Sequence, residues 1–188
     1  CEALWYKYEL TRDVPWIDQA LGSCRKAIEI NSGLAEPHVA IGRIHLGTGR
    51  HDEAKNAFET ALAINDRNTD AYQGLANAYS GLKQYGQAEA TYRKAISLRP
   101  GDWTGYKQLG LYFYRRGNVD QAIAQYEKVI ALTPDNAHGF VNIAAFWLRK
   151  EEPGKAKQYL ERALALDPNR TSSLTNLAKI YYDQGENQ

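Results

Sequence analysis

Apolar residues recur along the chain in alternating stripes at helical spacing, which predicts pairs of amphipathic helices. In residues 103–132 the first stripe consists of Tyr106, Leu109, Gly110 and Phe113, and the second of Ala122, Tyr126, Val129, Ile130 and Leu132. Gly117 lies between the stripes, where a glycine typically ends a helix and begins a turn. Because each stripe needs an apolar partner, the pattern predicts two antiparallel helices packed face to face.

A proline ends the second helix of this pattern at a fixed interval. The stretches AISLRPGDW, VIALTPDNA and ALALDPNRT place Pro100, Pro134 and Pro168 thirty-four residues apart. Proline cannot continue a helix because it lacks an amide hydrogen and its ring clashes with the preceding turn. The chain therefore reads as rows of 34 residues that begin at 1, 35, 69, 103, 137 and 171, and each residue has a numbered position in its row.

Small and large residues alternate at fixed positions of these rows. Position twenty is always alanine, namely Ala20, Ala54, Ala88, Ala122 and Ala156. Position twenty-four holds Cys24, Phe58, Tyr92, Tyr126 and Leu160, whereas position eight holds Gly42, Ala76, Gly110, Ala144 and Ala178. A small residue lets two helices approach closely and a neighbouring bulky side chain fills the remaining gap. We therefore expect complementary packing within and between rows.

The rows resemble the tetratricopeptide repeat, whose motif of Trp, Leu, Gly and Tyr followed by Ala, Phe, Ala and Pro is matched in type over residues 35–182. The resemblance implies an all-α fold, a right-handed superhelical solenoid of antiparallel helix pairs with about five and a half 34-residue units. We expect a single domain over 1–188, with an irregular row 1–34, regular rows 35–68, 69–102, 103–136 and 137–170, and a half-row 171–188.

The half-row repeats the first helix of a row and reaches the turn glycine, Gly185. Its apolar residues Leu174, Leu177, Ile180 and Tyr181 are expected to cover the second helix of the preceding row. The turn glycine followed by Glu186 favours a fragment of a larger, multidomain protein in which the repeats continue. Similarity of LAEPHVAIGRIHLGTGRHDEA to arrays of bacterial signalling proteins favours a bacterial source.

Composition excludes several classes of partner and site. The 188 residues carry a formal net charge of +1, which gives no electrostatic argument for nucleic acid or an anionic membrane. The apolar runs are too short to span a bilayer, so we expect a soluble protein, either cytoplasmic or an extracytoplasmic domain. Cys1 and Cys24 indicate neither a metal-binding cluster nor a disulfide framework.

The resemblance also implies a binding surface, because the first helices of such arrays line a concave groove with positions two, five, six, nine, twelve and thirteen. The candidate groove residues at these positions are Arg43, Gln73, Asn77, Lys107, Gln108, Tyr114, Arg115, His138, Asn142, Arg149, Asn176 and Lys179. The later half of this set is basic and aromatic. Such a surface suits an extended, acidic peptide, although these cations equally fit a solvated surface without a ligand.

No residue pattern indicates catalysis, a metal or a cofactor. His38 and His45 lie two helical turns apart, so we expect partly buried, hydrogen-bonded histidines rather than joint ligands. Glu151 and Glu152 lie in a turn without a converging partner, and the segment GTGR joins two helices rather than a strand and a helix. We therefore expect no enzyme activity.

These observations predict a protein–protein interaction module in a signalling or assembly protein, which binds a peptide or protein segment in its groove. Two alternatives stay open. One is a structural scaffold that self-associates through residues 171–188. The other is the repeat region of a glycosyltransferase, which would place an asparagine ladder along position six, where only Asn142 and Asn176 fit.

Overall fold

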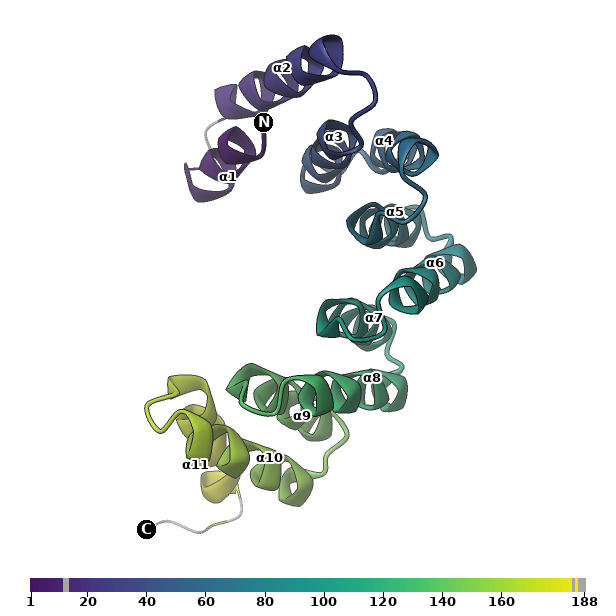
Figure 1. Ribbon diagram of the computed structural model, residues 1–188. Helices are drawn as coiled ribbons and strands as arrows, with labels where there is room; N and C mark the ends of the chain where they lie inside the picture. The colour runs from purple at the N-terminus through teal and green to yellow at the C-terminus, as the bar shows by residue number, and fades with distance from the viewer. Residues whose placement is uncertain (12–13, 184, 186–188) are drawn as a thin grey trace. The chain divides into compact units, whose positions relative to one another are not determined.

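A computed structural model describes residues 1–11, 14–183 and 185, and these residues form eleven α-helices and no strand. The chain divides into two compact units, residues 1–99 and 100–188. The first unit holds α1 (Glu2–Thr11), α2 (Pro15–Ile30), α3 (Glu36–Gly47), α4 (His51–Ile64), α5 (Thr69–Gly81) and α6 (Tyr85–Leu98). The second holds α7 (Trp103–Arg115), α8 (Val119–Leu132), α9 (Ala137–Arg149), α10 (Pro153–Leu166) and α11 (Thr171–Asp183) (Figure 1). The predicted all-α fold of helix pairs is confirmed.

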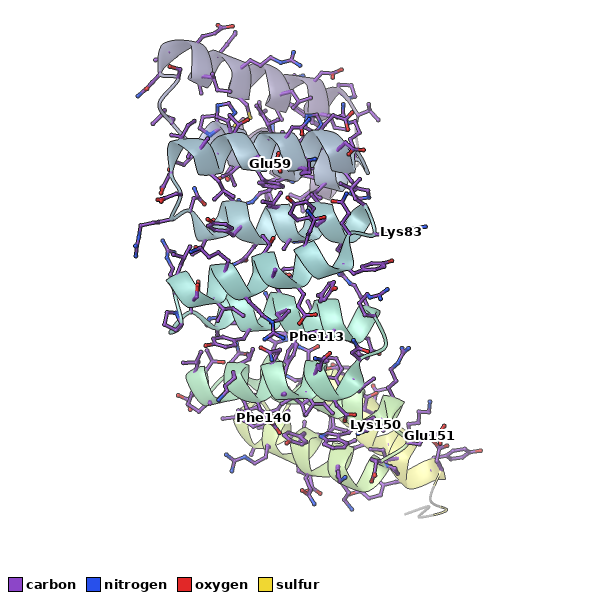
Figure 2. All side chains as sticks on the ribbon, turned by 90° about the vertical axis from the view of Figure 1, so that its right-hand side faces the viewer. Glu59, Lys83, Phe113, Phe140, Lys150 and Glu151 are labelled. Atoms are coloured by element: carbon purple, nitrogen blue, oxygen red, sulfur yellow. A yellow bond between two sulfur atoms is a disulfide. The ribbon has the colours of Figure 1, made fainter. Side chains whose placement is uncertain are left out.

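In each row from 35 onward, a residue with left-handed backbone geometry stands two residues after the end of the first helix. This residue always has position fifteen: Gly49, Gly117 and Gly185 have φ of 75°, 79° and 73°, and Lys83 and Glu151 have φ of 62° and 59°. Figure 2 shows Lys83 and Glu151 at these turns. The next amide closes the turn, as where Asn118 N donates to Phe113 O at 2.9 Å. Left-handed geometry reverses the chain within three residues and makes the paired helices antiparallel.

Side-chain caps begin three of the first helices. Asn68, Asp102 and Asn136 stand directly before α5, α7 and α9, and each side chain accepts a hydrogen bond from a backbone amide of the first turn. At the other end of the rows, α6, α8 and α10 end at Leu98, Leu132 and Leu166. Each of these ends lies two residues before a proline, as the sequence predicts.

Phe58 of α4 is the centre of the first unit's core. Its side chain is fully buried and packs among Val39, Ala71 and Leu75. A Cβ atom added to Gly42 of α3 would lie 2.6 Å from the ring, and one added to Gly74 of α5 would lie 2.2 Å from it. One aromatic ring therefore fills the space left by two glycines of neighbouring helices, which is the predicted complementarity of small and large residues.

The irregular first row folds onto its neighbour. Leu4 and Trp5 of α1 pack on the cluster formed by Ala20, Leu21, Cys24, Ala40 and Ile44 of α2 and α3. Cys1 and Cys24 form a disulfide, so the expectation of no disulfide is wrong. Two cysteines give no spacing pattern that indicates a bond, because this contact arises only when α1 folds back on α2.

The second unit repeats the same packing rule. Tyr126 of α8 lies against Gly110 of α7, where an added Cβ would be 2.7 Å from the ring, and it contacts the Phe146 ring edge to face at 5.0 Å between centroids. Figure 2 shows Phe113 and Phe140 between the helices of this unit. Toward the end of the chain, Leu177 and Ile180 of α11 pack on Ala156 and Leu160 of α10.

Two sequence expectations about single side chains need correction. Leu174 is 48% exposed and does not cover α10, whereas Leu177, Ile180 and Tyr181 do. His45 is partly buried as expected, but its buried Nδ1 has no hydrogen-bond partner among the described residues. Burial lowers the pKa of His45, and the positive charge of Arg50 lowers it further. Both effects favour the neutral form of the His45 ring.

The glycine contact of Phe58 gives a test of the packing rule. Gly74→Ala places a methyl group inside the ring's volume, and we expect a loss of about 1–3 kcal/mol in the free energy of unfolding. Gly22→Ala in the middle of α2 is the matched control because no atom lies within 4 Å of its added Cβ. Alanine is the better helix former, so this control should gain about 1 kcal/mol. Urea unfolding gives the free energy of unfolding of both variants. An equal change in the two variants would contradict the proposed contact between Phe58 and Gly74.

Lys83 and Glu151 give a second test because they occupy the left-handed position that is Gly49, Gly117 or Gly185 in three other rows. Lys83→Gly and Glu151→Gly should each raise the free energy of unfolding by about 1 kcal/mol, since glycine has no Cβ clash in this conformation. Lys94→Gly, within α6, should lower it by about 1 kcal/mol. Thermal unfolding distinguishes the two directions, and a loss of stability in all three variants would disprove the argument.

Candidate functional site

The predicted groove residues divide between the two units. Arg43, Gln73 and Asn77 belong to the first unit, and the other nine belong to the second. Two of the three side chains in the first unit, Arg43 and Asn77, form hydrogen bonds within the fold. Arg43 donates to Glu2 Oε1 and to Asp70 Oδ2, both at 3.0 Å. Asn77 accepts from Tyr92 Oη at 2.7 Å and donates to Gln73 O at 3.0 Å.

These contacts occupy the polar groups of Arg43 and Asn77 within the fold. Arg43 links the helices α1, α3 and α5, and two carboxylates neutralise its charge. The Asn77 amide uses both its oxygen and its nitrogen within the fold. Sequence reasoning placed both residues in the groove but did not predict their bonds to Glu2, Asp70 and Tyr92, which are 15 to 41 residues away.

The second unit contains a cleft between α7 and α9. Three predicted residues, Lys107, His138 and Asn142, line it together. The remaining lining residues are Trp103, Tyr126, Val129, Asn136 and Gly139, and the volume is about 230 Å³. This cleft is the candidate functional site.

The α7 wall of the cleft consists of an aromatic ring and a cation. Asp102 caps α7 by accepting a hydrogen bond from Thr104 N at 2.9 Å, which fixes the start of the helix at Trp103. Lys107 follows one turn later, and its Nζ lies 4.8 Å from the centroid of the Trp103 ring. The ring holds the ammonium group by a cation–π contact, so the cation's place is set without a carboxylate.

The α9 wall is organised by hydrogen bonds to the helix backbone. Asn136 accepts from His138 N at 3.0 Å, and Asn142 donates its Nδ2 to His138 O at 2.9 Å. The Asn142 Oδ1 atom stays available as an acceptor. His138 Nδ1 lies 3.2 Å from Arg170 Nη1, and Arg170 also pairs with Asp167 at 3.1 Å. The His138 ring is therefore held from outside the cleft.

The floor of the cleft comes from the core of α8. Tyr126 is 1% exposed and Val129 is 2% exposed, because both belong to the apolar stripe of that helix. Gly139 brings α9 close to this stripe, since a Cβ there would lie 2.7 Å from Ile130 Cγ2. Burial raises the pKa of Tyr126 to about 12, against a smaller opposing effect of the Arg115 charge. The phenol is therefore protonated at neutral pH.

A second cluster lies toward the C-terminal ends of α7 and α9. The Arg149 guanidinium stacks over the Tyr114 ring at 5.0 Å, and Tyr114 packs on Phe146 with 4.7 Å between ring centroids. Arg115 is exposed beside Tyr114 in the sequence. The other predicted residues do not line the cleft: Gln108 and Asn176 are half-buried, and Lys179 is exposed on α11.

Charge pairing differs among the cations of the described residues. Lys150 pairs with Asp120 and Arg170 with Asp167. Among residues 1–11, 14–183 and 185, no carboxylate lies within 4.0 Å of Lys107, Arg115, Arg149 or Lys179. The region of α7 and α9 therefore carries positive charge that the fold does not neutralise.

Metal-binding clusters and membrane-spanning helices are absent from the part of the chain that the structure describes. That part contains no group of three or more His, Cys, Asp or Glu side chains that could hold a metal ion. None of its helices combines the length and apolar character needed to cross a bilayer.

Sequence reasoning missed Trp103, Asn136 and the two floor residues Tyr126 and Val129. Trp103 had an available signal, because it lies one helical turn before Lys107 and shares its face. Tyr126 and Val129 were assigned to the core by their apolar stripe, and they do lie in the core. Their access to the cleft depends on the spacing of α7 and α9, which no local pattern reveals.

The rows of paired helices define an α-helical repeat protein. Two models of the tetratricopeptide repeat family match residues 45–110 and 107–171, which together cover more than half of the chain. The chain belongs to the tetratricopeptide repeat family. No curated protein matches it.

Solved structures of similar proteins agree with this family. YrrB, described as a TPR protein with an unusual peptide-binding site, is 27% identical, with 89% of this chain and 86% of that chain covered and a TM-score of 0.63. TTC0263, a thermophilic TPR protein of Thermus thermophilus, is 22% identical, with 96% of both chains covered and a TM-score of 0.72. PilF of Pseudomonas aeruginosa is 24% identical over 81% of this chain and 69% of that chain, with a TM-score of 0.69.

The capping role of Asn136 in the cleft wall can be tested directly. Asn136→Ala removes the acceptor for His138 N and should lower the free energy of unfolding by about 1 kcal/mol. Asn136→Asp keeps an acceptor oxygen and should retain most of the stability. Urea unfolding checks both variants, and an unchanged midpoint for the alanine variant would show that the cap does not stabilise α9.

Proposed function

We propose that this protein–protein interaction module binds an acidic peptide segment in the cleft between α7 and α9, and that it performs no chemistry. The observation that carries the proposal is the cleft itself, where Lys107 lies beside an apolar floor without a carboxylate partner. A cation held by an aromatic ring is ready to pair with an anionic ligand.

The composition of the cleft supports a peptide as the ligand. Trp103 and Val129 offer apolar surface to a side chain, and Asn142 Oδ1 offers an acceptor to a backbone amide. Arg115 and Arg149 extend the positive charge along the same two helices. An extended peptide needs these three kinds of contact: pockets for side chains, partners for its backbone and opposite charge. The similarity to YrrB, whose structure is described with a peptide-binding site, supports the same ligand class.

A role in a signalling or assembly protein follows as part of this proposal, since the module would recruit a partner without acting on it. Self-association through α11 has weaker support, because Leu177 and Ile180 of that helix are buried against α10. The glycosyltransferase alternative is also weaker, since Asn142 bonds its own helix and Asn176 is not in the cleft.

The experiment that tests the proposal is an array of acidic and basic decapeptides, screened at two salt concentrations. We expect salt-sensitive binding of acidic peptides, because exposed charge pairs weaken as salt screens them. The double variant Lys107→Glu and Arg149→Glu should lose affinity at least about tenfold, since charge-assisted hydrogen bonds are replaced by repulsion.

The matched control is Lys94→Glu with Lys128→Glu, which changes the net charge equally on the exposed faces of the second helices α6 and α8. The control should bind as the unaltered protein does. Equal losses in both double variants would mean that only net charge matters and would reject the cleft as the site. Chromatography of each variant checks that binding is not lost through a change of oligomeric state.

A further inference from the structure

Tyr92 and Tyr126 occupy the same position of successive rows, but only Tyr92 has a hydrogen-bond acceptor. Both rings are buried, with 2% and 1% exposure. Tyr92 Oη donates to Asn77 Oδ1 at 2.7 Å. In the row of Tyr126, the residue that corresponds to Asn77 is Leu111, which cannot accept. No other described residue accepts a hydrogen bond from Tyr126 Oη.

Tyr126 Oη is not one of the fully buried polar atoms that lack a hydrogen-bond partner, so this hydroxyl reaches the open space of the cleft, where it can donate to a ligand or to water. Tyr126 lines the cleft together with Lys107 and Asn142. Its raised pKa keeps the proton on the phenol, so the group can donate but carries no negative charge that would repel an anion. The cleft therefore contains two donors, one neutral and one cationic.

From this arrangement we infer that the cleft holds one acidic side chain of the bound peptide, with Tyr126 Oη donating to its carboxylate and Lys107 supplying the opposite charge. This inference rests on the proposed peptide binding and adds the identity of one ligand residue. It makes Tyr126 a specificity-determining residue, although its position in the row is otherwise one of core packing.

The size and lining of the cleft agree with a single side chain. Pockets that enclose whole small molecules have volumes of roughly 300–1,000 Å³. The cleft, at about 230 Å³, is smaller than this range. Trp103 and Val129 can contact the methylene groups of an acidic side chain, while Asn142 Oδ1 can accept from the peptide backbone and disfavours a second carboxylate.

Tyrosine-to-phenylalanine changes at the two equivalent positions provide a test without a ligand. Tyr126→Phe keeps the ring contacts with Gly110 and Phe146 and removes an unbonded hydroxyl, so its Tm should be unchanged or higher. Tyr92→Phe removes the bond to Asn77 and should lower the Tm by roughly 2–4 °C. A similar decrease in both variants would show that Tyr126 Oη has an acceptor within the protein, which would overturn the inference.

The ligand test uses the acidic decapeptide that binds most tightly in the array, acetylated and amidated so that its carboxylates come from side chains alone. Each acidic residue is replaced in turn by its amide. We expect one replacement to lower the affinity of the unaltered protein roughly tenfold, as for a hydrogen bond to a charged group. Tyr126→Phe should show a similar loss for the acidic peptide and no discrimination between acid and amide at that residue.

The outcomes separate this inference from the proposed function. If Tyr126→Phe discriminates acid from amide as well as the unaltered protein, while Lys107→Glu with Arg149→Glu abolishes binding, the role of Tyr126 is wrong and the peptide site stands. If no acidic peptide binds the unaltered protein, the proposed function itself fails. Binding that requires a free C-terminal carboxylate would overturn the assignment of an acidic side chain.

Discussion

The contact of an aromatic ring with glycine is the packing constraint on which both units depend. Phe58 lies against Gly42 of its own row and Gly74 of the next, so one side chain fixes the distance between three helices. A larger residue at either glycine would force the helices apart, because the ring has no free space in which to move. Within each unit, helices of adjacent rows pack on one another, so repetition of this local rule stacks the helix pairs of that unit.

The candidate site contains the same aromatic–glycine contact, but the aromatic residue is a tyrosine, which adds a hydroxyl group to the ring. Tyr126 stands where Phe58 stands two rows earlier, and its ring packs on Gly110 as the Phe58 ring packs on Gly42. The ring satisfies the packing requirement, while the hydroxyl adds a polar group at the floor of the cleft. A tyrosine at this position therefore keeps the core packing of its row and leaves its hydroxyl without an acceptor, because Leu111 of the same row stands where Asn77 stands in the row of Tyr92.

The helices, their turns and the alternation of small and large residues could be predicted because each depends on residues close in the sequence. Gly117 and Pro134 set the two ends of α8 through local backbone geometry alone. The partners of Arg43, the disulfide of Cys1 and the exposure of Leu174 could not be predicted in this way. These features depend on how side chains of different rows meet in space, and a 34-residue pattern describes positions without their rotamers or neighbours.

The groove cations of the two units differ in their ion pairing, and the acidic residues at position two of the rows contribute to this difference. Position two is Glu2, Glu36 and Asp70 in the first three rows, and Thr104, His138 and Ser172 in the last three. Arg43 is neutralised by the carboxylates at this position in the rows before and after its own. In the rows of Lys107, Arg115 and Arg149, position two is Thr104 or His138 rather than a carboxylate, so it does not neutralise the positive charge of these side chains. Two differences therefore distinguish the predicted groove residues of the two units. The second unit lacks the acidic residues at position two, and it carries the cations Lys107, Arg115, Arg149 and Lys179, where the first unit carries only Arg43.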